Sequence, residues 1–180
     1  MISHLEIEFK TLIDEKTYNN LLKEFNLLDK TFVQTNYYFD TKNYDLMDKK
    51  TVLRIRKKDQ YKLTKKEKNE LGNQETSIYL ADEEANKMLK NGFNANIINE
   101  NCYVNLVTSL KTTRAKTNYK NGIIFFDKSE YSGITDYEIE YEALDYEEGK
   151  KDFIEFLKLH NITEKTPISK SKRAFNSLKK

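Results

Sequence analysis

The first residues of the chain alternate strictly between apolar and polar side chains. In the segment 2–11, one parity holds Leu5, Ile7 and Phe9, and the other holds His4, Glu6, Glu8 and Lys10. Because successive side chains of a β-strand point to opposite faces, the pattern predicts a strand with one apolar face and one charged face. In an isolated case, such a pattern usually means that the charged face lies in water.

A second segment, 136–143, repeats this alternation with three carboxylates. One parity holds Glu138, Glu140 and Glu142, and the other holds Tyr137, Ile139 and Tyr141. Like charges two residues apart on a strand repel each other, and charges on neighbouring strands add to the repulsion. Two acidic strands in one chain therefore indicate that a cation binds between them.

The rest of the chain predicts six further strands, at 30–40, 51–58, 61–66, 74–80, 110–119 and 123–131. Asn121-Gly122 is a strong hairpin signal between the last two, and Ser132-Gly133 predicts the next turn. The stretch 93–107 is the hardest to interpret, and we expect a short helix followed by a connector there.

Helical spacing of apolar residues predicts helices at 14–25, 82–91 and 146–160, and a fourth helical segment begins at Lys170. Asp14 and Asp82 are expected to cap the first two helices, and Gly92 to end the second. The third helix is expected to bury Phe153, Ile154, Leu157 and Leu159.

Eight strands joined by hairpins and helical connectors predict an α+β fold in a single domain, residues 1–180. Five of these strands carry charged residues on one face. A closed eight-stranded antiparallel β-barrel hides one face of every strand, so we expect a polar tunnel with helices packed on the outside. Because buried unpaired charges cost several kcal/mol each, such a tunnel requires a charged ligand.

Composition narrows the class of protein. The 180 residues include 31 basic and 29 acidic side chains, so the net charge of +2 says little about partners. The single cysteine, Cys102, excludes a disulfide framework and is expected to be a packing thiol in a cytoplasmic protein. There is no apolar run of transmembrane length and no signal peptide, so we expect no membrane contact. A P-loop, a nucleophile elbow and a Cys-His pair are also missing.

The chain resembles the CYTH superfamily, also called triphosphate tunnel metalloenzymes, and in particular its small single-domain bacterial members. The resemblance begins with Glu6-x-Glu8-x-Lys10 and extends over nearly the whole chain. The other matching motifs, in order, are Asn36-Tyr-Tyr-Phe-Asp-Thr41, Leu53-Arg-Ile-Arg56, Tyr61-x-Leu-Thr-x-Lys66, Glu75, Thr113-Arg114, Asp127, Glu138-x-Glu140 and Lys170-Ser. The first motif alone is weakly specific, whereas the ordered set is highly specific.

The resemblance implies a barrel that binds a triphosphate together with Mg²⁺ or Mn²⁺. It implies that Glu6, Glu8, Glu138 and Glu140 bind the metal. The same four residues and Lys10 are the implied catalytic residues. The expected phosphate ligands are cationic: Lys10, Arg54, Arg56, Lys62, Lys66, Arg114, Lys170 and Arg173. Glu75 and Asp127 are further candidates, which either touch metal or pair with the cations of the tunnel.

Two positions stay open in the sequence. Lys65 stands where the family has an apolar residue, so either Lys65 or Lys66 faces the tunnel; parity with Lys62 favours Lys66. In the terminal segment, Lys172 and Arg173 compete with Lys170 for the inward position.

The implied activity is hydrolysis of inorganic tripolyphosphate, or of a nucleoside or other organic triphosphate, by a metal-activated water. An adenylate cyclase-type nucleotidyl cyclase and a non-catalytic module that binds polyphosphate or triphosphorylated RNA are the alternatives. We expect a small anionic substrate, no DNA partner, and a monomer or homodimer. The natural substrate stays open.

Overall fold

The computed structural model describes residues 1–70 and 72–179. Its strands are β1 (Ile2–Ile13), β2 (Phe32–Asp40), β3 (Thr51–Lys57), β4 (Tyr61–Lys68), β5 (Asn73–Leu80), β6 (Phe93–Asn94), β7 (Tyr103–Tyr119), β8 (Gly122–Tyr131) and β9 (Ile134–Ala143). They are hydrogen-bonded in the order β2-β3-β4-β5-β1-β9-β8-β7-β6, and a further β2–β7 pairing closes eight of them into an antiparallel barrel. The predicted fold class is confirmed, with β6 as an additional strand.

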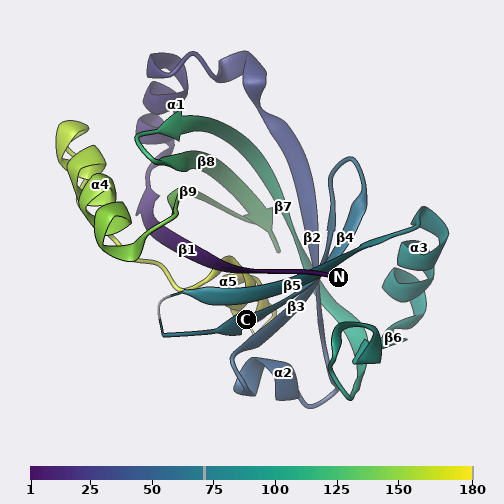
Figure 1. Cartoon of the computed structure of the whole chain (residues 1–180). Coiled ribbons are helices and arrows are strands. Elements are labelled where there is room, and N and C mark those ends of the chain that lie inside the picture. The colour runs from purple at the N-terminus through teal and green to yellow at the C-terminus, as the bar shows by residue number, and fades with distance from the viewer. Residues whose placement is uncertain (71, 180) are drawn as a thin grey trace. The chain divides into compact units, whose positions relative to one another are not determined.

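Five α-helices accompany the strands in the described residues: α1 (Glu15–Glu24), α2 (Asp45–Asp48), α3 (Asp82–Asn91), α4 (Tyr146–Leu159) and α5 (Lys170–Asn176) (Figure 1). Among the residues that the structure describes, no helix is both long enough and apolar enough to cross a membrane. The chain divides into two compact units, which are described separately below. The first unit comprises Met1–Leu5, Gln34–Leu110 and the residues from Lys170 onward, and the second comprises Glu6–Val33 and Lys111–Ser169.

In the first unit, apolar side chains of β3, β4 and β5 pack under α3. Leu53 and Ile55 of β3 and Leu63 of β4 are at most 1% exposed and share a core with Ala85 and Met88 of α3. Since side chains alternate along a strand, the opposite face of β3 and β4 carries the intervening polar residues. The apolar pattern therefore determines which residues point away from this core.

The second unit has its own core, which α1 and α4 form with β8 and β9 (Figure 1). Asp14 caps α1 as predicted, because its carboxylate accepts a hydrogen bond from the Thr17 backbone N–H at 2.7 Å. In α4 the predicted buried face is partly wrong. Leu159 is 65% exposed, whereas Phe156 is fully buried. The buried residues Phe153, Phe156 and Leu157 follow the i, i+3, i+4 spacing of one helix face, and Leu159 falls outside that face.

Two local expectations differ from the structure. The strand expected at 110–119 already begins at Tyr103, and its first residues pair with β6. The short helix expected within 93–107 is present as a 3-10 helix, Ala95–Ile98, which lies between β6 and β7. Leu106 is 40% exposed although it is apolar, so burial along this stretch does not follow a simple period. The predicted N-cap role of Asp82 is wrong, because Ala81 occupies the N-cap position and Asp82 lies in the first turn of α3. There the negative charge of Asp82 interacts favourably with the helix dipole.

The hairpin between β7 and β8 uses Lys120 and Asn121 as its two loop residues, because Tyr119 pairs directly with Gly122. A side chain at Gly122 would meet the Glu142 carbonyl oxygen at 2.5 Å, so glycine is required there by close packing of β9. The predicted turn at Ser132-Gly133 is confirmed, and both of its residues have positive φ.

Candidate active site

In the first unit, cationic side chains lie on the face of β3 and β4 that points away from the apolar core. The register pairs Arg56 with Lys62 across these strands, and it pairs Lys66 with Glu75 of β5. Arg54 lies two residues before Arg56 and therefore shares its face. These alternating strands thus place four cations and one carboxylate on a single surface.

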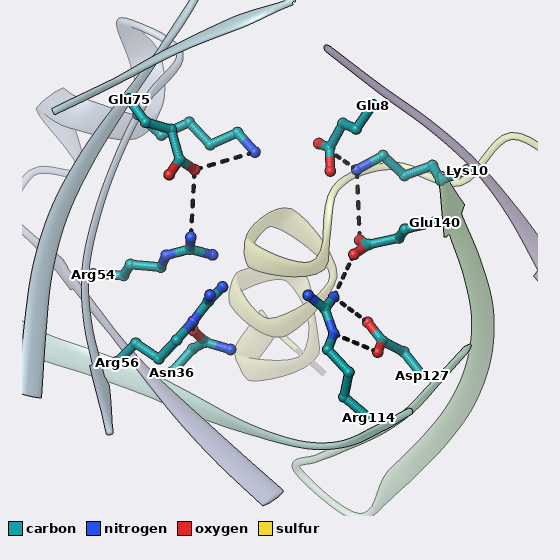
Figure 2. Close-up of polar contacts among 10 residues, drawn as sticks. Glu8, Lys10, Asn36, Arg54, Arg56, Glu75, Arg114, Asp127 and Glu140 are labelled. Carbon is teal, nitrogen blue, oxygen red and sulfur yellow. Dashed lines mark hydrogen bonds and ion pairs between the residues drawn. The ribbon is translucent and has the colours of Figure 1, made fainter. Parts of the chain in front are cut away.

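Glu75 is the anionic centre of this group. Its Oε1 lies 3.3 Å from Nη2 of Arg54 and 3.5 Å from Nζ of Lys66 (Figure 2). Burial opposes ionisation of Glu75, but the charges of Arg54, Lys66 and Arg56 outweigh it and hold the pKa of the carboxyl group below its usual value. In the structure Glu75 therefore lies with cations, which is the pairing role considered for it in the sequence.

The side chain of Arg56 is oriented by Asn36 of β2. Nε of Arg56 donates a hydrogen bond to Oδ1 of Asn36 at 2.9 Å, and Asn36 is only 2% exposed. Asn36 stands in one of the sequence motifs, but no role was assigned to it. The signal in the sequence is an amide followed directly by Tyr37, Tyr38 and Phe39 in a predicted strand, because an amide buried among such residues needs a hydrogen-bond partner.

The structure separates Lys65 from Lys66. Lys66 joins Glu75, whereas Lys65 pairs with Glu67 at 3.0 Å and with Glu100 at 3.2 Å. Lys65 pairs in register with Leu53, so it lies on the face of the apolar core. The parity argument that favoured Lys66 therefore holds, and Lys65 compensates its burial with two carboxylates.

In the second unit, the motif at the start of β1 meets the acidic strand β9. Lys10 pairs in register with Glu140, and Leu12 with Glu138. Nζ of Lys10 lies 2.8 Å from Oε1 of Glu8 and 4.0 Å from Oε1 of Glu140 (Figure 2). The two alternating segments are thus adjacent, and the amino group of Lys10 lies between a carboxylate of each.

Arg114 of β7 connects two of the carboxylates. Its guanidinium group donates to both oxygens of Asp127, at 2.7 and 2.5 Å, and also to Oε2 of Glu140 (Figure 2). The group lies over the ring of Phe125, 4.3 Å from its centroid. Burial works against the charge of Arg114, but Asp127 and Glu140 outweigh burial and raise the pKa of the guanidinium further. Arg114 is therefore a permanent cation in a fixed orientation.

Asp127, Glu138 and Glu140 form a buried group in which one oxygen atom of each lies within 4.8 Å of the others. Asp127 and Glu138 are fully buried and pair in register across β8 and β9, and Glu140 is 8% exposed. Carboxylate oxygens are the ligands that Mg²⁺ and Mn²⁺ prefer, so this donor set fits a divalent cation. Two of the four predicted metal ligands, Glu138 and Glu140, belong to the group. Glu6 and Glu8 lie half-buried on β1 and are not part of it.

The C-terminal candidates lie on α5. Lys170 and Arg173 are half-buried, and Lys172 is exposed. The surface hollow of about 490 Å³ next to α3 contains none of the charged residues described above. It is open to solvent and lined mainly by helix side chains, so it does not define the candidate site.

Comparison with known proteins identifies the family. The family model described as "CYTH domain" matches residues 4–175. The chain is 32% identical over 189 residues to a Bacillus subtilis (strain 168) protein named "Putative triphosphatase YjbK", and the match covers 100% of this chain and 99% of that protein.

Solved structures show the same fold. A Bacillus halodurans protein, named "putative adenylate cyclase", is 31% identical with a TM-score of 0.89, over 97% of this chain and 100% of the other. The Hippeastrum protein HpAC1, described as having a dominant triphosphatase activity, is 22% identical with a TM-score of 0.77, over 96% of both chains. Because the family model spans nearly the whole sequence and the B. subtilis relative matches over its full length, the chain belongs to the CYTH domain family.

Proposed function

We propose that this protein hydrolyses a triphosphate with the help of a divalent cation, Mg²⁺ or Mn²⁺. The observation that carries the proposal is the group of three buried carboxylates, Asp127, Glu138 and Glu140, beside the fixed guanidinium of Arg114. Buried carboxylates are costly unless cations compensate them. The name of the B. subtilis relative supports the same activity.

The cationic residues are proposed to bind the phosphates. In the first unit we assign this role to Arg54, Arg56, Lys62 and Lys66, and to Lys170 and Arg173 of α5. In the second unit we assign it to Lys10 and Arg114. Arginine presents a planar fork to two phosphate oxygens, and lysine presents a point charge. Positioning and charge neutralisation supply most of the catalysis in phosphoryl transfer, so no covalent nucleophile is required.

We propose that Glu138 and Glu140 are metal ligands, since the resemblance and the buried group both include them. Glu6 and Glu8 are assigned as ligands on the resemblance, and Asp127 is assigned on its place in the group. When bound, a divalent cation would neutralise phosphate charge and lower the pKa of a coordinated water. Within the chain, Lys10 holds Glu8 and Arg114 holds Asp127 and Glu140, so these contacts keep the carboxylates oriented.

The name of the B. halodurans relative favours a second candidate function, a nucleotidyl cyclase. The two reactions differ in their products. The test is to incubate the protein and Mg²⁺ or Mn²⁺ with tripolyphosphate, ATP, thiamine triphosphate or triphosphorylated RNA, and to separate the products by chromatography. We expect orthophosphate as a product. Cyclic AMP with pyrophosphate would identify a cyclase instead, and binding without turnover would identify a non-catalytic module.

The setting of this activity is also a proposal. The protein would act in the cytoplasm as a monomer or homodimer on a small anionic substrate, without DNA or a membrane as partner.

Arg56 and its neighbour Lys57 test the assignment of faces. We expect Arg56→Ala to weaken triphosphate binding by about 2–5 kcal/mol, because a desolvated charged contact is lost. Lys57 points to the other face, where its Nζ lies 4.1 Å from the centroid of the Tyr61 ring, so Lys57→Ala should leave affinity nearly unchanged. Isothermal titration calorimetry with tripolyphosphate measures both effects. Equal losses in the two variants would contradict the assignment of Arg56 to phosphate binding.

A further inference from the structure

One row of side chains in the first unit runs across four neighbouring strands and ends in an aromatic ring. The register aligns Asn36 of β2 with Arg56 of β3, Arg56 with Lys62 of β4, and Lys62 with Tyr79 of β5. Neighbouring strands lie about 5 Å apart, so the backbone of Tyr79 is one strand from Lys62 and two strands from Arg56. Nζ of Lys62 lies 6.0 Å from the centroid of the Tyr79 ring.

Exposure changes sharply along this face of β5. Glu75 is 4% exposed, Ser77 is 2% exposed and Tyr79 is 60% exposed, whereas the next residue, Leu80, is buried on the opposite face. The face that carries the ion-paired Glu75 therefore opens to solvent at Tyr79. Single exposed tyrosines are common on protein surfaces, but this ring lies in line with two cations assigned to phosphate.

We propose that Tyr79, together with Lys62, is a binding subsite for the base of a nucleoside triphosphate. This inference rests on the proposed function and specifies its substrate class. A phosphate bound between Arg56 and Lys62 leaves its organic substituent within reach of the Tyr79 ring. Every nucleobase has a π-face that stacks on an aromatic side chain, whereas inorganic tripolyphosphate has no group that can do so.

The test compares two ligands in matched variants. Tyr79→Leu removes the ring and keeps an apolar side chain, and Tyr79→Phe keeps the ring. Calorimetry in the presence of Mn²⁺, with ATP and with tripolyphosphate as ligands, measures affinity without requiring turnover. We expect Tyr79→Leu to raise the Kd for ATP about tenfold, the scale of one base–aromatic stack, and to change the Kd for tripolyphosphate less than twofold. Tyr79→Phe should match the wild type with both ligands.

Tyr103 supplies the control, since it belongs to the same unit and is 55% exposed. Its hydroxyl group donates a hydrogen bond to the Asn91 carbonyl oxygen. Its partner in register is Asn94, which is not a cation assigned to phosphate binding. Tyr103→Leu should leave both affinities unchanged. An equal effect of Tyr79→Leu on ATP and tripolyphosphate, or no effect on either, would overturn the subsite while leaving the proposed function intact. If neither ligand binds to the wild-type protein, both the proposed function and the subsite are wrong.

Discussion

Chelation of divalent cations should abolish phosphate release from tripolyphosphate, and addition of Mg²⁺ or Mn²⁺ should restore it. The expectation follows from the buried group Asp127, Glu138 and Glu140, because carboxylate oxygens held close together are the ligands that Mg²⁺ and Mn²⁺ prefer. Without a divalent cation, a bound triphosphate would add its own negative charge to these carboxylates. Phosphate release is measured after exhaustive dialysis against EDTA and again after each metal is added. Turnover that persists without metal would contradict the proposed mechanism.

Metal binding also has a signature that does not depend on turnover. A cation that binds only the folded state at a hundred times its Kd adds about 2.7 kcal/mol to the free energy of unfolding. For a chain of this length, the corresponding rise in Tm is roughly 5–10 °C. Glu130→Gln is a suitable control, because Glu130 lies on the other face of β8 from Asp127 and pairs with Lys111 at 3.6 Å. This variant should keep both the metal-induced rise in Tm and the activity.

The alternating segments could be predicted from sequence because burial imposes a period of two on each strand. Leu53 and Ile55 are buried and Arg54 and Arg56 share the other face, as the pattern required. The stretch 93–107 could not be predicted in the same way. It forms β6, a 3-10 turn and the start of β7, and the exposed Leu106 interrupts the alternation. Where tertiary contacts determine burial, local periodicity carries less information.

The sequence motifs supply the charged residues of the candidate site, but not the pairing among them. Which carboxylates meet depends on strand register, and register is set by pairings between distant segments, such as Asp127 with Glu138. The sequence left Asp127 and Glu75 as equivalent candidates. The structure places Glu75 with Arg54 and Lys66, and Asp127 with Glu138, Glu140 and Arg114. Charge alone did not separate these two environments.

Glu140→Gln should affect stability and activity in opposite directions. In the folded protein, Glu140 is 8% exposed and lies within the acidic group, where it accepts from Arg114. Glutamine keeps an oxygen acceptor for the guanidinium, and Arg114 retains its two hydrogen bonds to Asp127. The substitution removes one of the crowded negative charges, so we expect the free energy of unfolding without ligand to stay the same or rise slightly.

Catalysis should respond differently, because the same charge is proposed to bind the metal. We expect Glu140→Gln to lose about 2–4 kcal/mol of transition-state stabilisation, the scale seen when one positioned electrostatic group is removed. The rise in Tm produced by metal with tripolyphosphate should also shrink, since stabilisation by a ligand follows its affinity for the folded state. Thermal melts with and without ligand, together with kcat/KM for tripolyphosphate, measure both halves of the prediction. A variant with wild-type turnover and an unchanged ligand-induced rise in Tm would place Glu140 outside the metal site and leave its carboxylate with a purely structural role beside Arg114.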